Sequence, residues 1–293
     1  MKKNRIFIYT TIIYIIYFGL GIIALLNKDL QDNIAYELLT TIFTIIPLIA
    51  VFITRKITGD NSKFNVSLKV WKDVKMWLFC LIIPNVAIIL GAIVYYLFMS
   101  NDFNNNLVLA DFLSIFGLTS NDSTIISPFI AILITIILSI LLIPIHLLEL
   151  GEEIGWRGYL LPLQVKKYGT KKAILLNGLL WGIAHAPIIY FGFNYSLNNY
   201  LAPYSNIVMM IIFCIVVGII ESYVTIKTGN CMYAAIIHGV INITGEIPIC
   251  FSILKESTLL GPNPSGLIGM IFLIFIAIYL FIKSGKLENK LNC

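Results

Sequence analysis

Residues 76–99 read MWLFCLIIPNVAIILGAIVYYLFM and contain no Asp, Glu, Lys, Arg or His. A run of about 20 predominantly apolar residues is long enough to cross the hydrocarbon core of a bilayer as a helix. The whole chain has the same character, since 59% of its 293 residues are hydrophobic and only 12% are charged. Soluble domains carry about 25% charged residues. The chain is therefore expected to be a multi-pass membrane protein.

Seven other apolar runs of similar character occur along the chain. Because backbone polar groups in lipid must be bonded within their own segment, we expect every run to be a helix. The eight predicted spans are Ile6–Leu26, Leu38–Ile53, Met76–Met99, Pro128–Leu148, Ala173–Phe193, Ile207–Ile226, Cys231–Cys250 and Gly266–Ile282. The sequence thus predicts an all-α, polytopic membrane helix bundle of about eight transmembrane helices, organised as one domain over residues 1–293.

The distribution of Lys and Arg orients this bundle. Basic residues gather before the first span, in residues 54–75 and 157–172, at Lys227 and in the C-terminal tail, whereas residues 100–127 and 194–206 contain none. Loops rich in Lys and Arg stay on the cytoplasmic side of a membrane. Both termini are therefore expected to be cytoplasmic. The same clustering explains the net charge of +5 without a nucleic-acid partner.

One group of charged residues breaks this pattern at the end of the fourth span, where residues 149–157 read ELGEEIGWR. Glu153 and Arg157 have the i, i+4 spacing of an ion pair within a helix. Glu152 lies about 100° around the helix from Glu153, so that the two carboxylates face different directions. One carboxylate can then be neutralised while its neighbour stays available. The alternative is a solvated helix end that is merely rich in charge.

Two further polar groups lie inside predicted spans. Trp181 and His185 occupy a span without other ionisable residues, and Pro187 is expected to kink the helix next to His185. His238 and Asn242 are one helical turn apart in the seventh span. Polar groups at membrane depth are costly and usually face a cavity or a partner. The alternatives are a hydrogen-bonded core histidine and an interhelical hydrogen bond that only joins helices.

Three remaining polar residues are less informative. His146 lies two turns before Glu153, and we expect it to line the same cavity. Glu221 lies near the cytoplasmic end of its span, where interfacial solvation accounts for it. Glu246 continues the stripe of His238 and Asn242 without an assigned role.

Together, two histidines, a carboxylate and an amide can hydrolyse a peptide bond. A carboxylate and one histidine would take a proton from water, while the other histidine and the Asn would stabilise the oxyanion. The alternative chemistry uses a zinc ion, because one Glu and two His form the ligand set of several catalytic zinc sites. Its ligands would be Glu152, His185 and His238, converging from three helices. The sequence does not decide whether the reaction uses zinc or needs no cofactor.

The ordered triple Glu152-Glu153-x-x-x-Arg157, Trp181-x-x-x-His185 and His238-x-x-x-Asn242 resembles the motifs EExxxR, FxxxH and HxxxN/D of the CAAX-protease and bacteriocin-processing (CPBP) superfamily. This superfamily of intramembrane endopeptidases includes the eukaryotic type II CAAX prenyl endopeptidase and bacterial bacteriocin-immunity and lysostaphin-resistance-like proteins. The core motif region is expected over about residues 126–282.

The resemblance implies a role for each residue of the motifs. Glu152 would activate water together with His185, and His238 and Asn242 would hold the oxyanion. The supporting residues, including a second glutamate that is sometimes also counted as catalytic, are Glu153, Arg157 and Trp181, the last in the aromatic position of its motif.

The resemblance further implies a peptide or membrane-protein substrate in the lipid bilayer. The Ile-, Asn- and Lys-rich composition is typical of a low-GC bacterium, which places the chain in a bacterial plasma membrane. Two alternative functions remain: a non-catalytic protein of the bacteriocin-immunity kind, and a transporter of small solutes or ions. A transporter would show inverted repeats, whereas the polar motifs of this chain all follow residue 145.

Overall fold

The computed structural model describes residues 4–26, 34–114, 118 and 120–291. Its elements are α1 (Arg5–Leu26), α2 (Ile34–Thr58), α3 (Val74–Phe98), β1 (Leu107–Val108), α4 (Leu109–Ser114), β2 (Ile125–Ile126), α5 (Pro128–Leu141), α6 (Ile143–Glu153), α7 (Leu161–Tyr168), α8 (Thr170–Ala184), α9 (Ala186–Tyr190), α10 (Tyr204–Thr228), α11 (Met232–Thr244) and α12 (Ile271–Ser284). A π-helix, Ile154–Leu160, joins α6 to α7, and 3₁₀ turns occupy Val70–Asp73, Ser100–Asp102 and Ile247–Phe251. The two short strands pair antiparallel.

The all-α, polytopic membrane architecture predicted from the sequence is confirmed. Each predicted span consists largely of helix, although the last begins with turns before Ile271. Large apolar side chains such as Leu97, Phe98 and Phe129 are about three-quarters exposed on the outside, where lipid would cover them. Within the described residues, 4 helices are long and apolar enough to cross a membrane, or 5 if a bent pair counts as one span. The count of eight spans and the cytoplasmic termini stay predictions, and Lys2, Lys3 and Cys293 lie outside the described residues.

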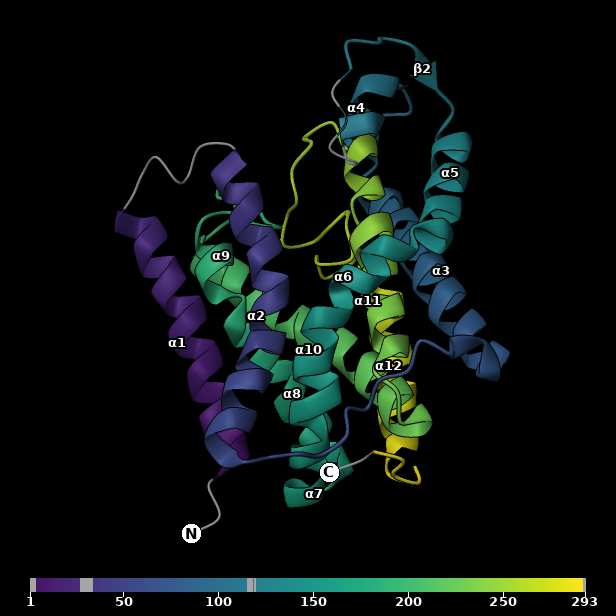
Figure 1. Cartoon of the computed structure of the whole chain (residues 1–293). Helices are drawn as coiled ribbons and strands as arrows, with labels where there is room; N and C mark the ends of the chain where they lie inside the picture. The colour runs from purple at the N-terminus through teal and green to yellow at the C-terminus, as the bar shows by residue number, and fades with distance from the viewer. Residues whose placement is uncertain (1–3, 27–33, 115–117, 119, 292–293) are drawn as a thin grey trace.

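The fourth predicted span, Pro128–Leu148, is not one straight helix. It breaks after Leu141, and the two pieces meet at 60°. Pro144 lies in the first turn of α6, where its missing N–H costs little, although it could not continue α5 as a regular helix. The bend turns α6 toward the middle of the bundle (Figure 1).

The fifth predicted span is also interrupted, as Pro187 indicated. Helix α8 ends at Ala184, His185 is a turn, and α9 begins at Ala186. Helix α8 packs closely on α10 through glycines, because a Cβ on Gly178 or Gly182 would meet the Cα of Ile215 or Ile211 at 2.8 and 2.7 Å. The small residues therefore bring the two backbones together at the level of His185.

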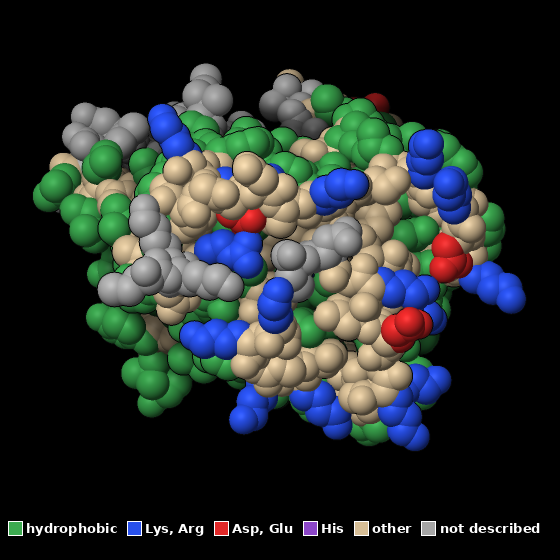
Figure 2. Space-filling model, turned by 60° about the horizontal axis from the view of Figure 1, so that its bottom comes forward, with side chains coloured by type: hydrophobic (Ala, Val, Ile, Leu, Met, Phe, Trp, Pro, Cys, Tyr) green, Lys and Arg blue, Asp and Glu red, His purple; other side chains and the backbone are tan. Residues whose placement is uncertain are grey.

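Lys and Arg side chains gather on one face of the bundle, which we call the basic face. It contains the start of α1, the end of α2, α7 and the end of α10 (Figures 1 and 2). The opposite end, which we call the outer face, contains β2, α4, residues 191–203 and residues 252–258 (Figure 1). In the described part of the chain, the only lysine or arginine in the segments of this end is Lys255, paired with Asp111.

Replacing Gly178 by Ala is expected to lower the thermal stability of the detergent-solubilised protein. The new methyl group would lie 2.8 Å from the Cα of Ile215 and 2.9 Å from the carbonyl oxygen of Cys214. Backbone atoms cannot give way easily, and overpacking of this kind costs about 1–3 kcal/mol. Gly19→Ala is the matched control, because Gly19 is also helical but has nothing within 4 Å of its Cβ position. Equal melting temperatures for the two variants would contradict this packing.

Candidate active site

A fully buried arginine lies at the base of the site. Arg157 Nη1 lies 2.9 Å from Glu153 Oε1, and its Nη2 lies 2.6 Å from Glu221 Oε2. The guanidinium carbon also lies 4.1 Å from the centre of the Trp181 ring. All three charged side chains are 0% exposed. Burial of charges is tolerated only when they are paired in this way.

The ion pair expected between Glu153 and Arg157 is therefore present, but the interpretation of Glu221 was wrong. Glu221 is not solvated at the interface; it is the second partner of Arg157. Room for the guanidinium comes from Gly218, one turn earlier on α10, where a Cβ would meet Arg157 Nη2 at 3.2 Å. The sequence did contain a sign of this contact, because Gly218 and Glu221 are one turn apart on one side of a helix.

The π-helix that carries Arg157 is held by a neighbouring amide. Asn177 on α8 donates a hydrogen bond to the carbonyl oxygen of Trp156 at 3.0 Å and another to Gln164 at 2.9 Å. A π-helix leaves backbone groups without regular partners and often occurs at functional sites. The amide of Asn177 thus stabilises the segment that positions the arginine.

Above this layer lies a cavity of about 290 Å³. Its polar lining includes residues of all three sequence motifs, namely Glu149, Glu152, Trp181, His185, His238 and Asn242. Glu153 and Arg157 do not line it. The adjacent carboxylates Glu152 and Glu153 therefore face different surroundings, as their positions around the helix predict.

Glu152 is held by an indole. Trp181 Nε1 donates a hydrogen bond to Glu152 Oε1 at 2.6 Å. Phenylalanine, which occupies this position in the motif that the chain resembles, has no N–H to offer. The other carboxylate oxygen of Glu152 is left for the cavity.

The ring of His185 is held in one tautomer. Its Nδ1 lies 2.9 Å from the carbonyl oxygen of Trp181. A carbonyl only accepts hydrogen bonds, so Nδ1 carries the hydrogen and Nε2 of the neutral ring has a free lone pair. The break in the helix at His185 is what lets the ring bond the carbonyl one turn back.

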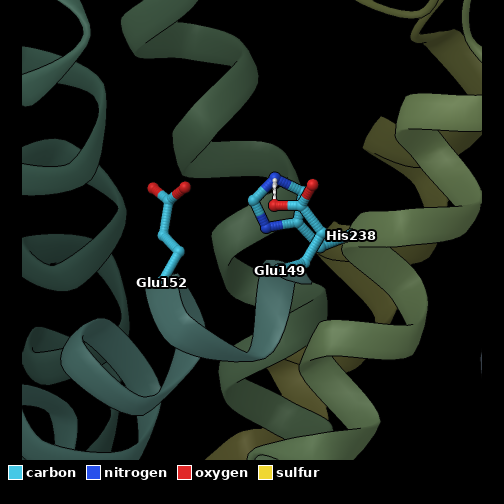
Figure 3. A group of neighbouring side chains, drawn as sticks. All are labelled: Glu149, Glu152 and His238. Atoms are coloured by element: carbon cyan, nitrogen blue, oxygen red, sulfur yellow. Dashed lines mark ion pairs between the residues drawn. The ribbon is translucent and has the colours of Figure 1, made fainter. Parts of the chain in front are cut away.

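His238 lies between the carboxylates of Glu153 and Glu149, and Figure 3 shows its ion pair with Glu149. Its Nδ1 is 3.0 Å from Glu153 Oε1, and its Nε2 is 3.4 Å from Glu149 Oε2. Asn242 donates to the other oxygen of Glu149 at 3.1 Å. The two side chains expected to bind an oxyanion thus converge on a carboxylate that is already present. Glu149 was expected only to belong to the charged segment 149–157, although it precedes Glu152 by one helical turn.

Two other residues and one segment either lie elsewhere than predicted or had no predicted role. His146 does not line the cavity: its Nε2 bonds the carbonyl oxygen of Ser139 at 2.9 Å, and its ring packs against Gly239. Glu246, left without a role, lines the cavity and is exposed. The segment Asn263–Ser265 also lines it, and only the polar residues in an otherwise apolar region hint at this.

One group of side chains has the composition of a metal site. Ligand atoms of Glu149, Glu152 and His238 all lie within 4.8 Å of one another, whereas the set with His185 does not form such a group among the described residues. Two carboxylates and an imidazole suit zinc. Glu149 Oε2 is buried and accepts no hydrogen bond of regular geometry, although His238 Nε2 lies 3.4 Å away, which also fits a cation. A second group, Glu153, Glu221 and His238, fits less well because Arg157 already forms an ion pair with each carboxylate.

Comparison with known proteins identifies this region. Residues 124–244 match the family described as "Type II CAAX prenyl endopeptidase Rce1-like". These residues are similar to an Rce1-like domain. The chain is also 29% identical over 142 residues to the CAAX prenyl protease 2 of Methanococcus maripaludis. That match covers 47% of this chain and 48% of the relative, so it spans about half of each protein.

The matched region contains all three motifs, and the resemblance to the CPBP superfamily is thereby confirmed. Its bounds run from just before α5 to the end of α11. The wider motif region to residue 282 and the single-domain division of residues 1–293 remain predictions.

Replacing Arg157 by Met is expected to destabilise the protein strongly, because Glu221 would remain buried without a counter-charge and Glu153 would keep only His238 as a partner. Breaking a buried ion pair in this way costs about 3–5 kcal/mol. The measurement is thermal unfolding in detergent. Arg5→Met is the matched control, since the Arg5–Asp60 pair is partly exposed and such pairs contribute about 1 kcal/mol or less. The double variant Arg157→Met/Glu221→Leu should recover part of the loss; no recovery would show that the carboxylate of Glu221 is not the cause.

Proposed function

We propose that the chain is an intramembrane endopeptidase that hydrolyses peptide bonds of small peptides or membrane-associated proteins, in a bacterial plasma membrane. The observation that carries the proposal is the cavity that unites Glu152, His185, His238 and Asn242 above a buried ion-pair layer. The match of residues 124–244 to an endopeptidase family supports it.

Water would be activated between Glu152 and His185. The indole of Trp181 holds one oxygen of Glu152, which leaves the second oxygen to accept a proton from water. Nε2 of His185 is available as a second acceptor because Nδ1 is committed to the carbonyl of Trp181. A positioned base of this kind accelerates hydrolysis, and the proton would then pass to the amine that leaves.

His238 and Asn242 would stabilise the oxyanion of the tetrahedral intermediate. Both donors now face Glu149, whose carboxylate resembles such an oxyanion in charge and size. A substrate carbonyl would therefore have to displace the carboxylate of Glu149 before the donors can bind it. In this state Glu149 competes with the substrate for the oxyanion hole.

A zinc-dependent mechanism is the second candidate, favoured by the cluster of Glu149, Glu152 and His238. These three residues would hold the ion, which would lower the pKa of a bound water and polarise the carbonyl. We favour the glutamate mechanism, because Trp181 and Asn242 already donate hydrogen bonds to the two carboxylates. A chelator distinguishes the two chemistries.

Glu152→Gln is expected to reduce peptide cleavage by roughly 100- to 10,000-fold, because the amide cannot take a proton from water. Wild type and variant would be compared in lipid nanodiscs with quenched fluorescent peptides, with and without chelator. The melting temperature serves as a folding control. Unchanged turnover would exclude Glu152 as the base, and a wild type inert toward every peptide would favour a non-catalytic function.

Glu149→Gln is expected to have the opposite effect and to raise kcat/KM about fivefold. Hydrogen bonds to a charged group are stronger than neutral ones by about 1 kcal/mol, so the neutral amide would compete less for Asn242 and His238. The same peptide assay provides the measurement. A loss of activity would show instead that the carboxylate of Glu149 positions His238 or binds a metal ion.

A further inference from the structure

A period of three residues runs through the segment that leads into α3. Residues 68–75 read LKVWKDVK, so that Leu68, Trp71 and Val74 recur every three residues and each is followed by a lysine. Val70–Asp73 is a 3₁₀ turn, which has three residues per turn and therefore places side chains at i and i+3 in one row. The segment thus presents an apolar row beside a row of lysines.

Both rows point away from the bundle. In the apolar row, Leu68, Trp71 and Val74 are 57%, 61% and 51% exposed. The lysine row consists of Lys69, Lys72 and Lys75. All three lysines are exposed, and none of them forms an ion pair with another described residue. A contiguous apolar patch with a polar rim typically marks an interaction or membrane surface.

The third row of the same repeat holds the segment on the bundle. Val70 packs against the core, and Met76 is buried. Asp73 is the only acidic residue in residues 61–75, and its carboxylate accepts the backbone N–H of Met76 at 3.0 Å, which caps α3. The hydroxyl of Tyr233 on α11 donates to the carbonyl oxygen of Val70 at 2.9 Å. These contacts fix the directions of the two exposed rows.

The segment lies where the chain passes from the basic face into the membrane. It runs from the end of α2 across the bundle to the start of α3 (Figure 1). Asn230, which follows the basic end of α10, exchanges two hydrogen bonds of 2.8 Å with the backbone of Ser67. The uninterrupted apolar run Met76–Met99 begins directly after Lys75. Tryptophan side chains at such a boundary lie at the level of the lipid headgroups.

We propose that residues 68–75 form a binding site for the headgroups of anionic phospholipids. The apolar row would lie among the upper parts of the acyl chains, and the lysine row would contact the phosphates at the same depth. A solvated loop needs only the lysines, whereas an apolar row beside a basic row is the pattern of a segment that lies in a membrane surface. This binding is independent of the proposed function of the cavity.

Quenching of the fluorescence of Trp71 by brominated lipids tests the proposal. The substitution Trp77→Phe removes the partly exposed second tryptophan, and the remaining two, Trp156 and Trp181, are buried. This protein is reconstituted in phosphatidylcholine vesicles that contain a small fraction of brominated phosphatidylglycerol. Parallel vesicles contain the same fraction of brominated phosphatidylcholine.

Each lysine near an anionic surface strengthens binding about fivefold. Phosphatidylglycerol is therefore expected to occupy the positions beside Trp71 at least about fivefold more often than phosphatidylcholine at equal fractions. High salt should weaken this preference, because it screens exposed charges. Equal quenching by the two lipids, or a preference that does not respond to salt, would overturn the proposal.

Two triple variants in the same background locate the binding site. The lysine-row variant is Lys69→Gln/Lys72→Gln/Lys75→Gln. The control variant removes the same charge from exposed positions of α7 and α8 and is Lys166→Gln/Lys167→Gln/Lys172→Gln. The lysine-row variant should lose the preference for phosphatidylglycerol, and the control should keep most of it. A preference that survives in the lysine-row variant, or that is lost equally in both, would contradict a site at residues 68–75. If the lysine-row variant does not fold, the salt dependence of the unsubstituted lysine row decides.

Discussion

The ion-pair layer around Arg157 is the interaction on which the rest of the site depends. Removing a guanidinium and two carboxylates from water is costly, and only close pairing compensates for it. The partners come from α6 and α10, and the ring that faces the guanidinium comes from α8. Satisfying one buried charge thus fixes the relative positions of three helices and, with them, the positions of Glu152 and His185.

The same layer separates two environments within the bundle. Below it the side chains of the π-helix are buried, whereas above it a cavity is lined by polar groups of three motifs. The backbones approach closely at Gly178, Gly182 and Gly218, which brings these groups together. Hydrolysis inside a membrane needs such a division, because water must reach the reacting bond while the remaining interior stays apolar.

Much of this arrangement could be predicted from local spacing. The i, i+4 pair of Glu153 and Arg157, the different directions of Glu152 and Glu153, and the break beside Pro187 all follow from helical geometry over one or two turns. The wrong predictions concern contacts between different helices, which the spacing of residues along one helix does not describe. His146 was placed in the cavity because it lies two turns before Glu153, but neither side chain lines the cavity, and across the 60° bend the ring of His146 bonds the carbonyl oxygen of Ser139.

By itself, the sequence determined that this chain is an apolar helical bundle with ionisable groups in three helices, since composition and helical periodicity are local properties. Only the tertiary structure decided which of these groups meet. It paired Glu221 with Arg157 and placed Glu149 against His238 and Asn242. The reason is physical: a buried charge must find its partner across helices, and that choice depends on how the helices bend, rotate and pack.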